Sequence, residues 1–458
     1  MKLSGLDIFV VFTYFAFLLV LALYFRWKKI VFSDFSVAGR SVSSMLVTLS
    51  LLATLIGPGY SIALADKGMN YGYLYFFIFC FFSVQYVLTG LYFAPRLQEH
   101  TDCHSLGDVL RKAYGSHMQV VVGIVSLVLT VAFSAIMAKV GGSILSGILD
   151  IEFNTAVLIV TFIGVLYAVT GGLKAVIYTE VVQAVLILVA TILLLMFMLE
   201  EKQVPVDWMA SALASTDKAI ESHTVISLIG LSLAFLLGEF LIPPYANRAF
   251  ASRTKSIASK SFIAAGIMSA VWFFIVVTIG VLSAYFINQG GDQGAFIGSG
   301  FAVLPSGLLG LFVVALASIV MSTQESLFNA GATSFVRDIM RNDGADEVKD
   351  LASVRIVTLF VSASAVFVAI YAPNILSILL AGYAVWVPIV AVPLAWYLLT
   401  GKTDIVVAYS SVIVGGVLSI SSMVIDPAAI ENGLAVFVGV FGNAVGAAFG
   451  LVFRSKRG

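Results

Sequence analysis

Charged side chains are scarce in this sequence of 458 residues. Asp, Glu, Lys and Arg together make up only 11% of it, whereas hydrophobic residues make up 60%. Soluble globular proteins contain about 25% charged and about 45–50% apolar residues. With a mean hydropathy of +1.05, most of the molecular surface cannot face water. The composition therefore excludes a series of soluble domains and predicts an integral membrane protein.

Net charge, a cysteine framework and catalytic motifs are missing as well. The 25 basic residues equal the 25 acidic ones, so charge gives no reason to expect a nucleic-acid partner. Cys80 and Cys103 are too few for a disulfide framework. The run His100-Thr101-Asp102-Cys103-His104 has no second cysteine pair, and we expect no transition metal there. Since no phosphate-binding loop, zinc-protease motif or nucleophile elbow occurs, we expect a protein that is not an enzyme and has no cofactor.

Long apolar runs are what the sequence does contain. A helix that crosses a bilayer takes about 20 residues, and thirteen runs are long enough. We expect an all-α, polytopic membrane protein with about 13 transmembrane helices. The runs cover residues 5–26, 45–66, 71–95, 118–147, 153–170, 173–199, 224–247, 262–287, 303–335, 353–372, 374–399, 405–425 and 431–453.

Lysine and arginine are distributed unevenly between the two sides that these runs define. With the N-terminus outside, the inner loops and tail hold twenty of them, and the outer loops hold only Lys2, Lys67, Lys202 and Lys218. Cytoplasmic loops carry such an excess of positive charge. We expect a cell-membrane protein with its N-terminus outside and its C-terminus in the cytoplasm. The first run lacks a signal-peptide cleavage site, so we expect it to be retained.

Two loops are long enough to carry structure of their own. Apolar residues at helical spacing between Ser105 and Gly115 predict a capped amphipathic helix that lies on the inner membrane surface. The acidic outer loop, residues 200–223, is expected to hold a short helix around residues 208–213.

Two predicted membrane helices carry helix breakers in their middle. The second contains Gly57-Pro58-Gly59, and the seventh contains Pro243-Pro244 beside Glu239. Because these helices are five apart, and five is odd, a second copy of the unit enters the membrane from the opposite side. Paired interrupted helices in an inverted repeat indicate a solute site near the midplane of a transporter. The alternative is that each break is a proline kink used for packing.

This repeat predicts the organisation of the chain as a 5+5 inverted repeat with one extra N-terminal and two extra C-terminal helices. We expect an N-terminal helix and cytoplasmic loop in residues 1–40 and the first five-helix repeat in 41–200. The second repeat is expected in 201–400, followed by two helices and a short basic tail in 401–458.

Four ionisable residues lie inside predicted membrane helices: Lys139, Glu180, Glu239 and Glu325. Charges within a bilayer are costly and usually functional. A polar stripe with spacings of three and four surrounds Glu325, and Thr179, Glu180 and Gln183 follow the same spacing. Oxygen ligands of this kind suit a small alkali cation, especially beside carbonyl groups exposed at a helix break. The stripe consists of Ser322, Thr323, Glu325, Ser326 and Asn329.

Each of these residues also has a purely structural interpretation. Serine and threonine hydroxyls bond back to helix carbonyls or to neighbouring helices. Lys139 lies towards the outer end of its helix, where it would equally snorkel to the membrane surface. Glu180 follows Leu173 by only seven residues, which leaves a position near the inner interface open.

Four stretches carry more specific patterns. The first is GGLKAVIYTEVVQ, from Gly171 to Gln183, and the second is Met321 to Ser326 followed by Arg337-Asp338-Ile339. The third is Pro243 to Arg248 with Ala251-Ser252, and the fourth is Ala381 to Pro388 with Tyr383 and Trp386. In their order along the chain, these stretches resemble the motifs of the sodium:solute symporter family. The resemblance covers nearly the whole chain and implies the LeuT-like inverted-repeat fold.

The resemblance also implies a sodium site between the broken second helix and the ninth helix. It falls on the backbone carbonyls of Ala53, Ile56 and Ile319 and on the hydroxyls of Ser322 and Thr323. Some relatives have a second sodium site, and its positions here read Glu180, Glu325 and Ser326. Glutamate in place of aspartate and of a serine is compatible with a second cation or with a proton instead.

The solute pocket that the resemblance implies lies at the two breaks. It places Gly57, Gly59 and Tyr60 on one side, with Glu239 and Phe240 opposite. Lys139 loosely matches a cation that holds a substrate carboxylate in some relatives. We hypothesise that Lys139 and Glu239 hold the two ends of a zwitterionic or carboxylated solute.

These features predict a sodium-coupled symporter that imports a small organic solute by alternating access. Its partners would be the solute, Na⁺ as coupling ion and the lipid bilayer, without nucleic acid. One alternative is a proton-coupled transporter that uses Glu180 or Glu325. The others are a channel, for which no pore ring is evident, and a membrane sensor, for which no output domain follows the last helix. The solute, the sodium stoichiometry and the oligomeric state are left open by the sequence.

Overall fold

The computed structural model describes residues 3–27, 31–287, 294–341, 347–371 and 375–455. Within these ranges every regular element is a helix, and the one β-bridge joins Val42 to Ser252. The predicted all-α membrane fold is therefore confirmed. Of the basic residues behind the predicted orientation, Lys2, Lys28, Lys29, Lys456 and Arg457 lie outside the described ranges.

The first half of the chain contains twelve numbered elements. They are α1 (Gly5–Trp27), α2 (Phe32–Val37), η1 (Ala38–Arg40), α3 (Ser44–Leu55), η2 (Pro58–Tyr60), α4 (Ile62–Tyr71), α5 (Leu74–Leu88), η3 (Thr89–Phe93), α6 (Ala94–Gln98), α7 (Leu106–Tyr114), α8 (Ser116–Leu149) and α9 (Phe153–Glu200).

The second half contains fourteen numbered elements. They are α10 (Trp208–Ser222), α11 (Val225–Leu237), α12 (Pro243–Ala251), α13 (Lys255–Ser283), α14 (Ala295–Val303), α15 (Leu308–Ser334), η4 (Phe335–Ile339), α16 (Glu347–Tyr371), α17 (Ile375–Trp386), η5 (Val387–Ala391), α18 (Val392–Thr400), α19 (Ile405–Ile425), α20 (Ala428–Glu431) and α21 (Leu434–Ser455).

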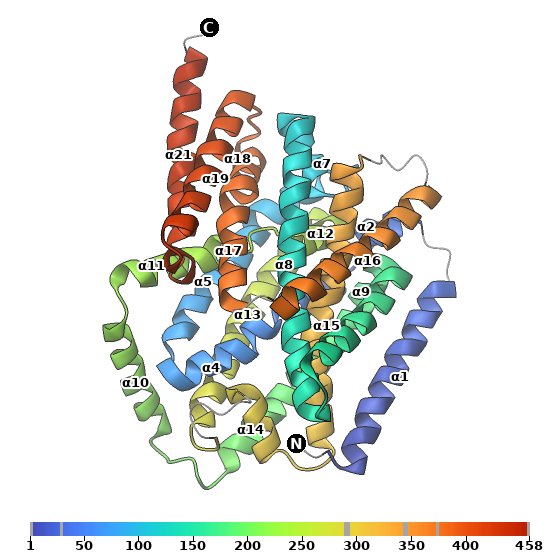
Figure 1. The fold of residues 1–458 in the computed structure, drawn as a ribbon, viewed down its shortest axis with the longest axis vertical. Helices are drawn as coiled ribbons and strands as arrows, with labels where there is room; N and C mark the ends of the chain where they lie inside the picture. The colour runs from blue at the N-terminus through green and yellow to red at the C-terminus, as the bar shows by residue number, and fades with distance from the viewer. Residues whose placement is uncertain (1–2, 28–30, 288–293, 342–346, 372–374, 456–458) are drawn as a thin grey trace.

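Membrane-spanning helices dominate the described part of the chain. Nine are long and apolar enough to cross a bilayer, and two bent pairs raise that number to as many as eleven. Two shorter apolar helices, Gly5–Leu21 and Phe153–Leu166, add further candidates. The number thirteen and the assignment of sides remain predictions. The start of α1 and the end of α21 lie at opposite ends of the molecule (Figure 1).

Both predicted helix breaks are present. α3 ends before Gly57, and α4 leaves at an angle of 80° to it. Pro58 opens η2 and Pro243 opens α12, which is where proline is best tolerated because its missing N–H has no helical partner. α11 ends at Leu237, and Leu241 has a φ of 47° in the gap before α12. Backbone carbonyls are therefore released from both helices in the interior of the protein.

A glycine divides α9 where two separate membrane helices were expected. Gly172 has a φ of 59°, outside the helical range, and α9 is kinked there. A Cβ on Gly172 would lie 2.5 Å from the Cα of Phe35. Only glycine fits this conformation and this close approach to α2.

The two loop helices differ in how well they were predicted. α7 spans Leu106–Tyr114 as expected, and the Ser105 side chain accepts a hydrogen bond from the Asp108 N–H. Its apolar face is covered by α8 and η4, however, so α7 packs against protein on the side that was assigned to the membrane surface. α10 is 15 residues long and extends well beyond the short helix that was expected.

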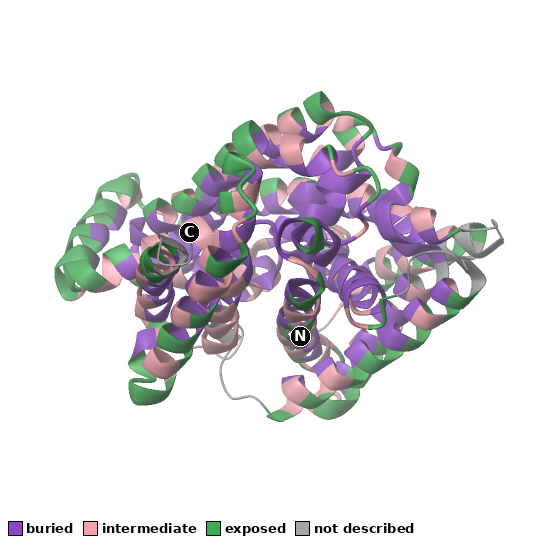
Figure 2. Cartoon of the chain, turned by 90° about the horizontal axis from the view of Figure 1, so that it is seen from above, coloured by how far each residue is buried: buried purple, intermediate pink, exposed green. Residues whose placement is uncertain are grey.

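α15 is the central helix of the fold. It contacts α1, α3, α8, α9, α12 and α16. In an 18-residue apolar stretch of the span that it forms with η4, 83% of the residues are buried, whereas the figure for α19 is 28%. Buried residues gather in the middle of the molecule and exposed ones around its rim (Figure 2). Large exposed apolar side chains on α1 and α19 mark surfaces that face lipid. The polar stripe on α15 therefore lies in the protein interior.

Candidate functional site

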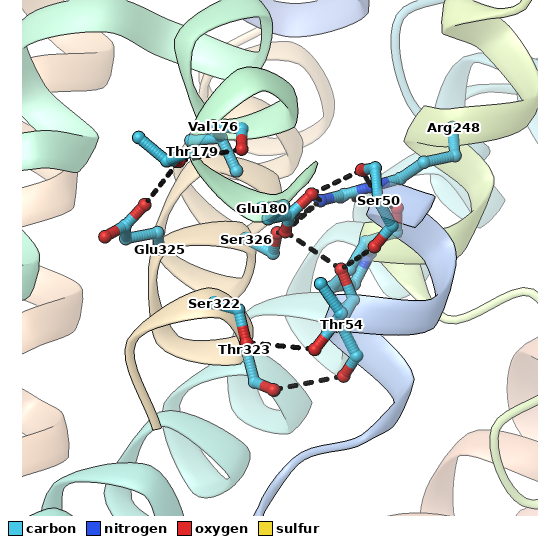
Figure 3. A network of polar contacts seen from close by, with 12 residues as sticks. Ser50, Thr54, Val176, Thr179, Glu180, Arg248, Ser322, Thr323, Glu325 and Ser326 are labelled. Atoms are coloured by element: carbon cyan, nitrogen blue, oxygen red, sulfur yellow. Dashed lines mark hydrogen bonds and ion pairs between the residues drawn. The ribbon is translucent and has the colours of Figure 1, made fainter. Parts of the chain in front are cut away.

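The unwound end of α3 faces two hydroxyls of α15. Ser322 Oγ donates to the carbonyl of Ala53 at 2.9 Å, and Thr323 Oγ1 donates to the carbonyl of Thr54 at 3.0 Å. Figure 3 shows both contacts side by side. Ser322 and Thr323, both predicted for the sodium site, thus contact the predicted carbonyl of Ala53 and the carbonyl of its neighbour Thr54. The sequence analysis did not single out Thr54.

The other two residues predicted for this site lie next to the same contact. Ile56 is the last residue before the break, and its carbonyl accepts a hydrogen bond from Ser61 Oγ at 2.9 Å. Ile319 is buried one turn before Ser322 and Thr323 on α15. The result is a cluster of neutral oxygen atoms from two helices, and such oxygens suit a hard cation of low charge.

An ion pair lies beside this cluster. Arg248 Nη2 donates to both carboxylate oxygens of Glu180, at 2.6 and 2.7 Å, and both side chains are fully buried. Arg248 Nε also donates to Ser50 Oγ at 3.1 Å, and Thr54 Oγ1 donates to Glu180 Oε1 at 2.9 Å. Thr54 therefore connects the two groups of contacts. Its hydroxyl bonds to the ion pair, and its carbonyl belongs to the oxygen cluster.

Arg248 was counted among the twenty basic residues of the inner loops and tail, and this placement was wrong. It lies on α12, inside the protein, where the helix break brings it back towards α3. Glu180 likewise lies in the interior, because Arg248 compensates its charge. The third motif pointed to Arg248 but did not indicate its partner.

The three residues of the possible second cation site divide into two groups. Ser326 joins Glu180, since its hydroxyl contacts both Glu180 Oε1 and Arg248 Nη2. Glu325 points the other way, and Thr179 Oγ1 lies 3.2 Å from its Oε2 (Figure 3). The positive charge beside Glu180 is thus supplied by the protein itself.

A cavity of about 570 Å³ opens beside the two helix breaks. Gly57, Pro58, Gly59 and Tyr60 line it from the first break, and Glu239 lines it from the second. A Cβ on Gly59 would have no atom within 4 Å, so this glycine faces open space. The volume falls in the range of sites for small organic ligands, about 300–1,000 Å³.

Glu239 is the buried one among the four charged residues that line this cavity, the others being Asp66, Lys67 and Glu431. Its Oε1 accepts hydrogen bonds from Tyr60 Oη at 2.8 Å and Tyr383 Oη at 2.7 Å. Its Oε2 accepts one from Tyr245 Oη at 2.5 Å. Three neutral donors hold the carboxylate without compensating its charge. Aromatic rings complete the walls, and the lining includes Tyr75, Phe79, Phe133 and Phe235.

Two residues predicted for the solute pocket are not among those that line the cavity. Phe240 packs against Phe93, with ring centroids 4.6 Å apart, and its carbonyl accepts a hydrogen bond from Trp386 Nε1. Lys139 is half-buried, and its neighbours on α8 line the cavity instead. The basic residue in the lining is Lys67, whose ammonium lies over the rings of Tyr71 and Tyr75.

The loop that contains His100 to His104 uses its side chains for structure. His104 Nδ1 lies 2.7 Å from Ser36 Oγ, and Cys103 is buried. Burial, together with the charges of Arg337 and Arg40, lowers the pKa of His104 to about 4. Burial raises the pKa of Cys103 to about 12. In the described part of the chain, no three His, Cys, Asp or Glu residues are grouped so that they could hold a metal ion.

Comparisons with known proteins bear on the family and the fold of the chain. The profile of the Sodium:solute symporter family matches residues 35–425. The sodium/glucose cotransporter 1 of Ovis aries is 24% identical over 73% of this chain and 58% of its own length. The sodium/myo-inositol cotransporter of Homo sapiens is 24% identical over 74% of this chain and 55% of its own length. The chain therefore spans just over half of these curated relatives, which are transporters and not enzymes.

Solved structures show the same fold. A Na⁺-coupled sialic acid symporter in a substrate-bound outward-open state superposes with a TM-score of 0.85 at 15% identity, over 98% of both chains. A nucleobase-cation-symport-1 transporter in a closed conformation matches with a TM-score of 0.56 at 11% identity, over 92% of this chain and 95% of its own. The predicted LeuT-like architecture is thereby confirmed.

Proposed function

Since the chain belongs to the sodium:solute symporter family, we propose that it couples the entry of Na⁺ to the import of a small organic solute across the cell membrane. The observation that carries this proposal is the contact of Ser322 and Thr323 with the carbonyls of Ala53 and Thr54. These neutral oxygens lie at a helix break beside the cavity, where transporters of this architecture bind ions and solutes.

Sodium acts by joining α3 to α15. When the ion binds, the carbonyls of Ala53, Ile56 and Ile319 and the two hydroxyls turn towards it and hold the break in one conformation. Gly57 and the ligand residue Thr323 both line the cavity, so the ion orders one wall of the solute site. Sodium then favours one state of the transport cycle by its higher affinity for that state.

The solute of this proposal is zwitterionic and presents its cationic group to Glu239. The carboxylate is held by three tyrosine hydroxyls and lies among aromatic rings. A carboxylate with aromatic walls is complementary to an ammonium group. Lys67, the basic residue of the lining, would meet a solute carboxylate, a role that the sequence analysis gave to Lys139.

Uptake into proteoliposomes tests the function and the solute class together. A panel would contain an amino acid, a quaternary ammonium compound, a neutral sugar and a dicarboxylate, each radiolabelled. We expect uptake driven by an inward sodium gradient and not by a matched potassium gradient, with the ammonium-bearing compounds preferred. Uptake of the sugar or the dicarboxylate alone would contradict the solute class. Equal uptake in both gradients would contradict sodium coupling.

A further inference from the structure

Helix α2 precedes the end of α3 that is opposite to the break, and it is too short to be stable by itself. It spans six residues, and short isolated helices do not persist in water. Its two phenylalanines are buried, with 3% of Phe32 and 1% of Phe35 exposed. They pack into an apolar cluster that is separate from the main core and is completed by α9, α15, η4 and α16, with residues such as Val165, Phe328 and Val357. This cluster is the seat of α2, and the position of α2 depends on it.

Polar contacts also hold α2 on its seat. The carbonyl of Phe35, near the C-terminus of the helix where carbonyls lack helical partners, accepts a hydrogen bond from Asn329 Nδ2 of α15 at 2.9 Å. Gly172 of α9 leaves room for the backbone of Phe35, and Lys174 Nζ lies 3.6 Å from Asp34 Oδ1. α2 also contacts α16, beside which it is drawn in Figure 1. Asn329, the last residue of the polar stripe on α15, thus serves to hold α2.

The link between α2 and α3 has an unusual backbone. Ala38, Gly39 and Arg40 are consecutive residues with φ of 49°, 59° and 53°. Alanine and arginine seldom adopt this left-handed conformation, which costs free energy and persists only where the surroundings impose it. Residues 38–40 therefore form a strained hinge between α2 and α3.

Contacts with α12 and with the loop after α6 impose this conformation. Arg40 donates through Nη1 to the carbonyl of Phe250 at 3.2 Å and through Nη2 to the carbonyl of Cys103. The N–H of Val42, just after the hinge, donates to the carbonyl of Ala251 at 3.1 Å. The two broken helices, α3 and α12, are therefore tied together at this end, and α2 connects the pair to the seat.

We propose that α2 is a latch that controls the movement of α3 and α12. Seated as it is here, α2 holds the hinge in its left-handed conformation and keeps the start of α3 close to α9 and α15. When α2 leaves its seat, the hinge loses this restraint, and α3 and α12 move together away from α15. The carbonyls of Ala53 and Thr54 on α3 then separate from Ser322 and Thr323. This last consequence, but not the latch itself, rests on the proposed sodium-coupled function.

Cross-linking of α2 to α9 tests the latch without a solute and without sodium. Asp34→Cys and Lys174→Cys would be combined in the full chain with Cys80→Ser and Cys103→Ala, so that a bis-methanethiosulfonate reagent joins only the two new thiols. Hydrogen–deuterium exchange, followed by mass spectrometry in potassium chloride, would compare α3 and α12 before and after the reaction. We expect the exchange of both helices to slow by about tenfold, because their local opening requires release of α2, and to recover when dithiothreitol cleaves the link.

Asp102 and Lys112 provide the matched control, because they form an ion pair between α7 and the loop before it. The same link between Asp102→Cys and Lys112→Cys should leave the exchange of α3 and α12 unchanged. If exchange stays unchanged when α2 is linked to α9, the latch is overturned, because α2 is then a fixed anchor. Equal slowing in both proteins would also overturn it, because the effect would not depend on α2.

Phe35→Ala tests the latch in the opposite direction, beside Phe12→Ala, which changes an exposed phenylalanine of α1. Emptying part of the seat should speed the exchange of α3 by about fivefold or more, whereas Phe12→Ala should leave it as in the wild type, and equal rates would contradict the latch. Should Phe35→Ala fail to fold, the cross-link decides alone. A cross-link that slows exchange in a protein that sodium does not stabilise would contradict sodium coupling and support the latch. Stabilisation by sodium without slowed exchange would overturn the latch alone.

Discussion

The guanidinium of Arg248 lies 2.6 Å from the carboxylate of Glu180, and neither side chain is exposed to solvent. Breaking such a buried pair leaves one charge without a partner and costs about 3–5 kcal/mol. Replacing both partners by apolar residues removes that penalty.

We therefore expect Arg248→Met and Glu180→Leu each to lower the free energy of unfolding by about 3–5 kcal/mol. The double variant should lose much less than the sum. Chemical or thermal unfolding in detergent measures this cycle. Lys255 and Glu99 provide the matched control, because their pair is exposed and should contribute about 0–1 kcal/mol. Additive losses for Arg248 and Glu180 would contradict the interaction.

Gly57 and Gly59 differ in what an added methyl group would meet. A Cβ on Gly57 would lie 2.9 Å from Thr323 Oγ1, whereas one on Gly59 would have open space around it. Gly57→Ala should therefore push α3 from α15 and weaken the response to sodium by about tenfold or more, equivalent to about 1.4 kcal/mol. Gly59→Ala should keep that response. The midpoint of a sodium titration, followed by thermal stability, compares them, and equal midpoints would contradict the assigned contact.

Glu239 should decide the affinity for an ammonium-bearing solute. Glu239→Gln removes the charge but keeps the size of the side chain, and we expect the apparent affinity to fall by at least about tenfold, or 1.4 kcal/mol.

Lys67→Ala should weaken binding of a zwitterion and leave a plain amine unaffected. Lys139→Ala is the comparison, because Lys67 lines the cavity and Lys139 does not. A larger loss for Lys139→Ala would restore the role that the sequence analysis gave it.

The contact of His104 with Ser36, outside the membrane-spanning helices, should be sensitive to acid. Its pKa is lowered from 6.5 to about 4, so the folded protein keeps the imidazole neutral where the unfolded chain takes up a proton. Stability is then unaffected by this group above about pH 6.5 and falls as the pH drops towards about 4. The melting temperature of wild type should decline more steeply over this range than that of His104→Gln. Parallel curves would contradict the prediction.

The sequence predicted the elements whose signals are local. An apolar run, a proline in a helix and a polar stripe can each be recognised from residues that are close in the sequence. The helices, and the breaks at Pro58 and Pro243, lie where these signals predict them. The Ser105 cap of α7 is another local signal that holds.

Contacts between residues that are far apart in the sequence could not be predicted from local patterns. Arg248 lies 68 positions from Glu180, and its motif gives no indication that α12 turns back into the protein. Lys67 was assigned to an outer loop because it follows an apolar run, although the bend between α3 and α4 places it in the lining of the cavity. Thr54 was missed because a hydroxyl inside an apolar helix is usually bonded to its own backbone.

We propose that Ser322 and Thr323 help to bind sodium against the broken end of α3. The most direct measurement melts the purified protein in sodium chloride and in potassium chloride at equal ionic strength, beside the variant Ser322→Ala/Thr323→Val. Sodium at about 100 times its dissociation constant should stabilise the wild type by about 2.7 kcal/mol, and the variant should not respond. The same melting curve for the wild type in both salts would contradict sodium binding at this site.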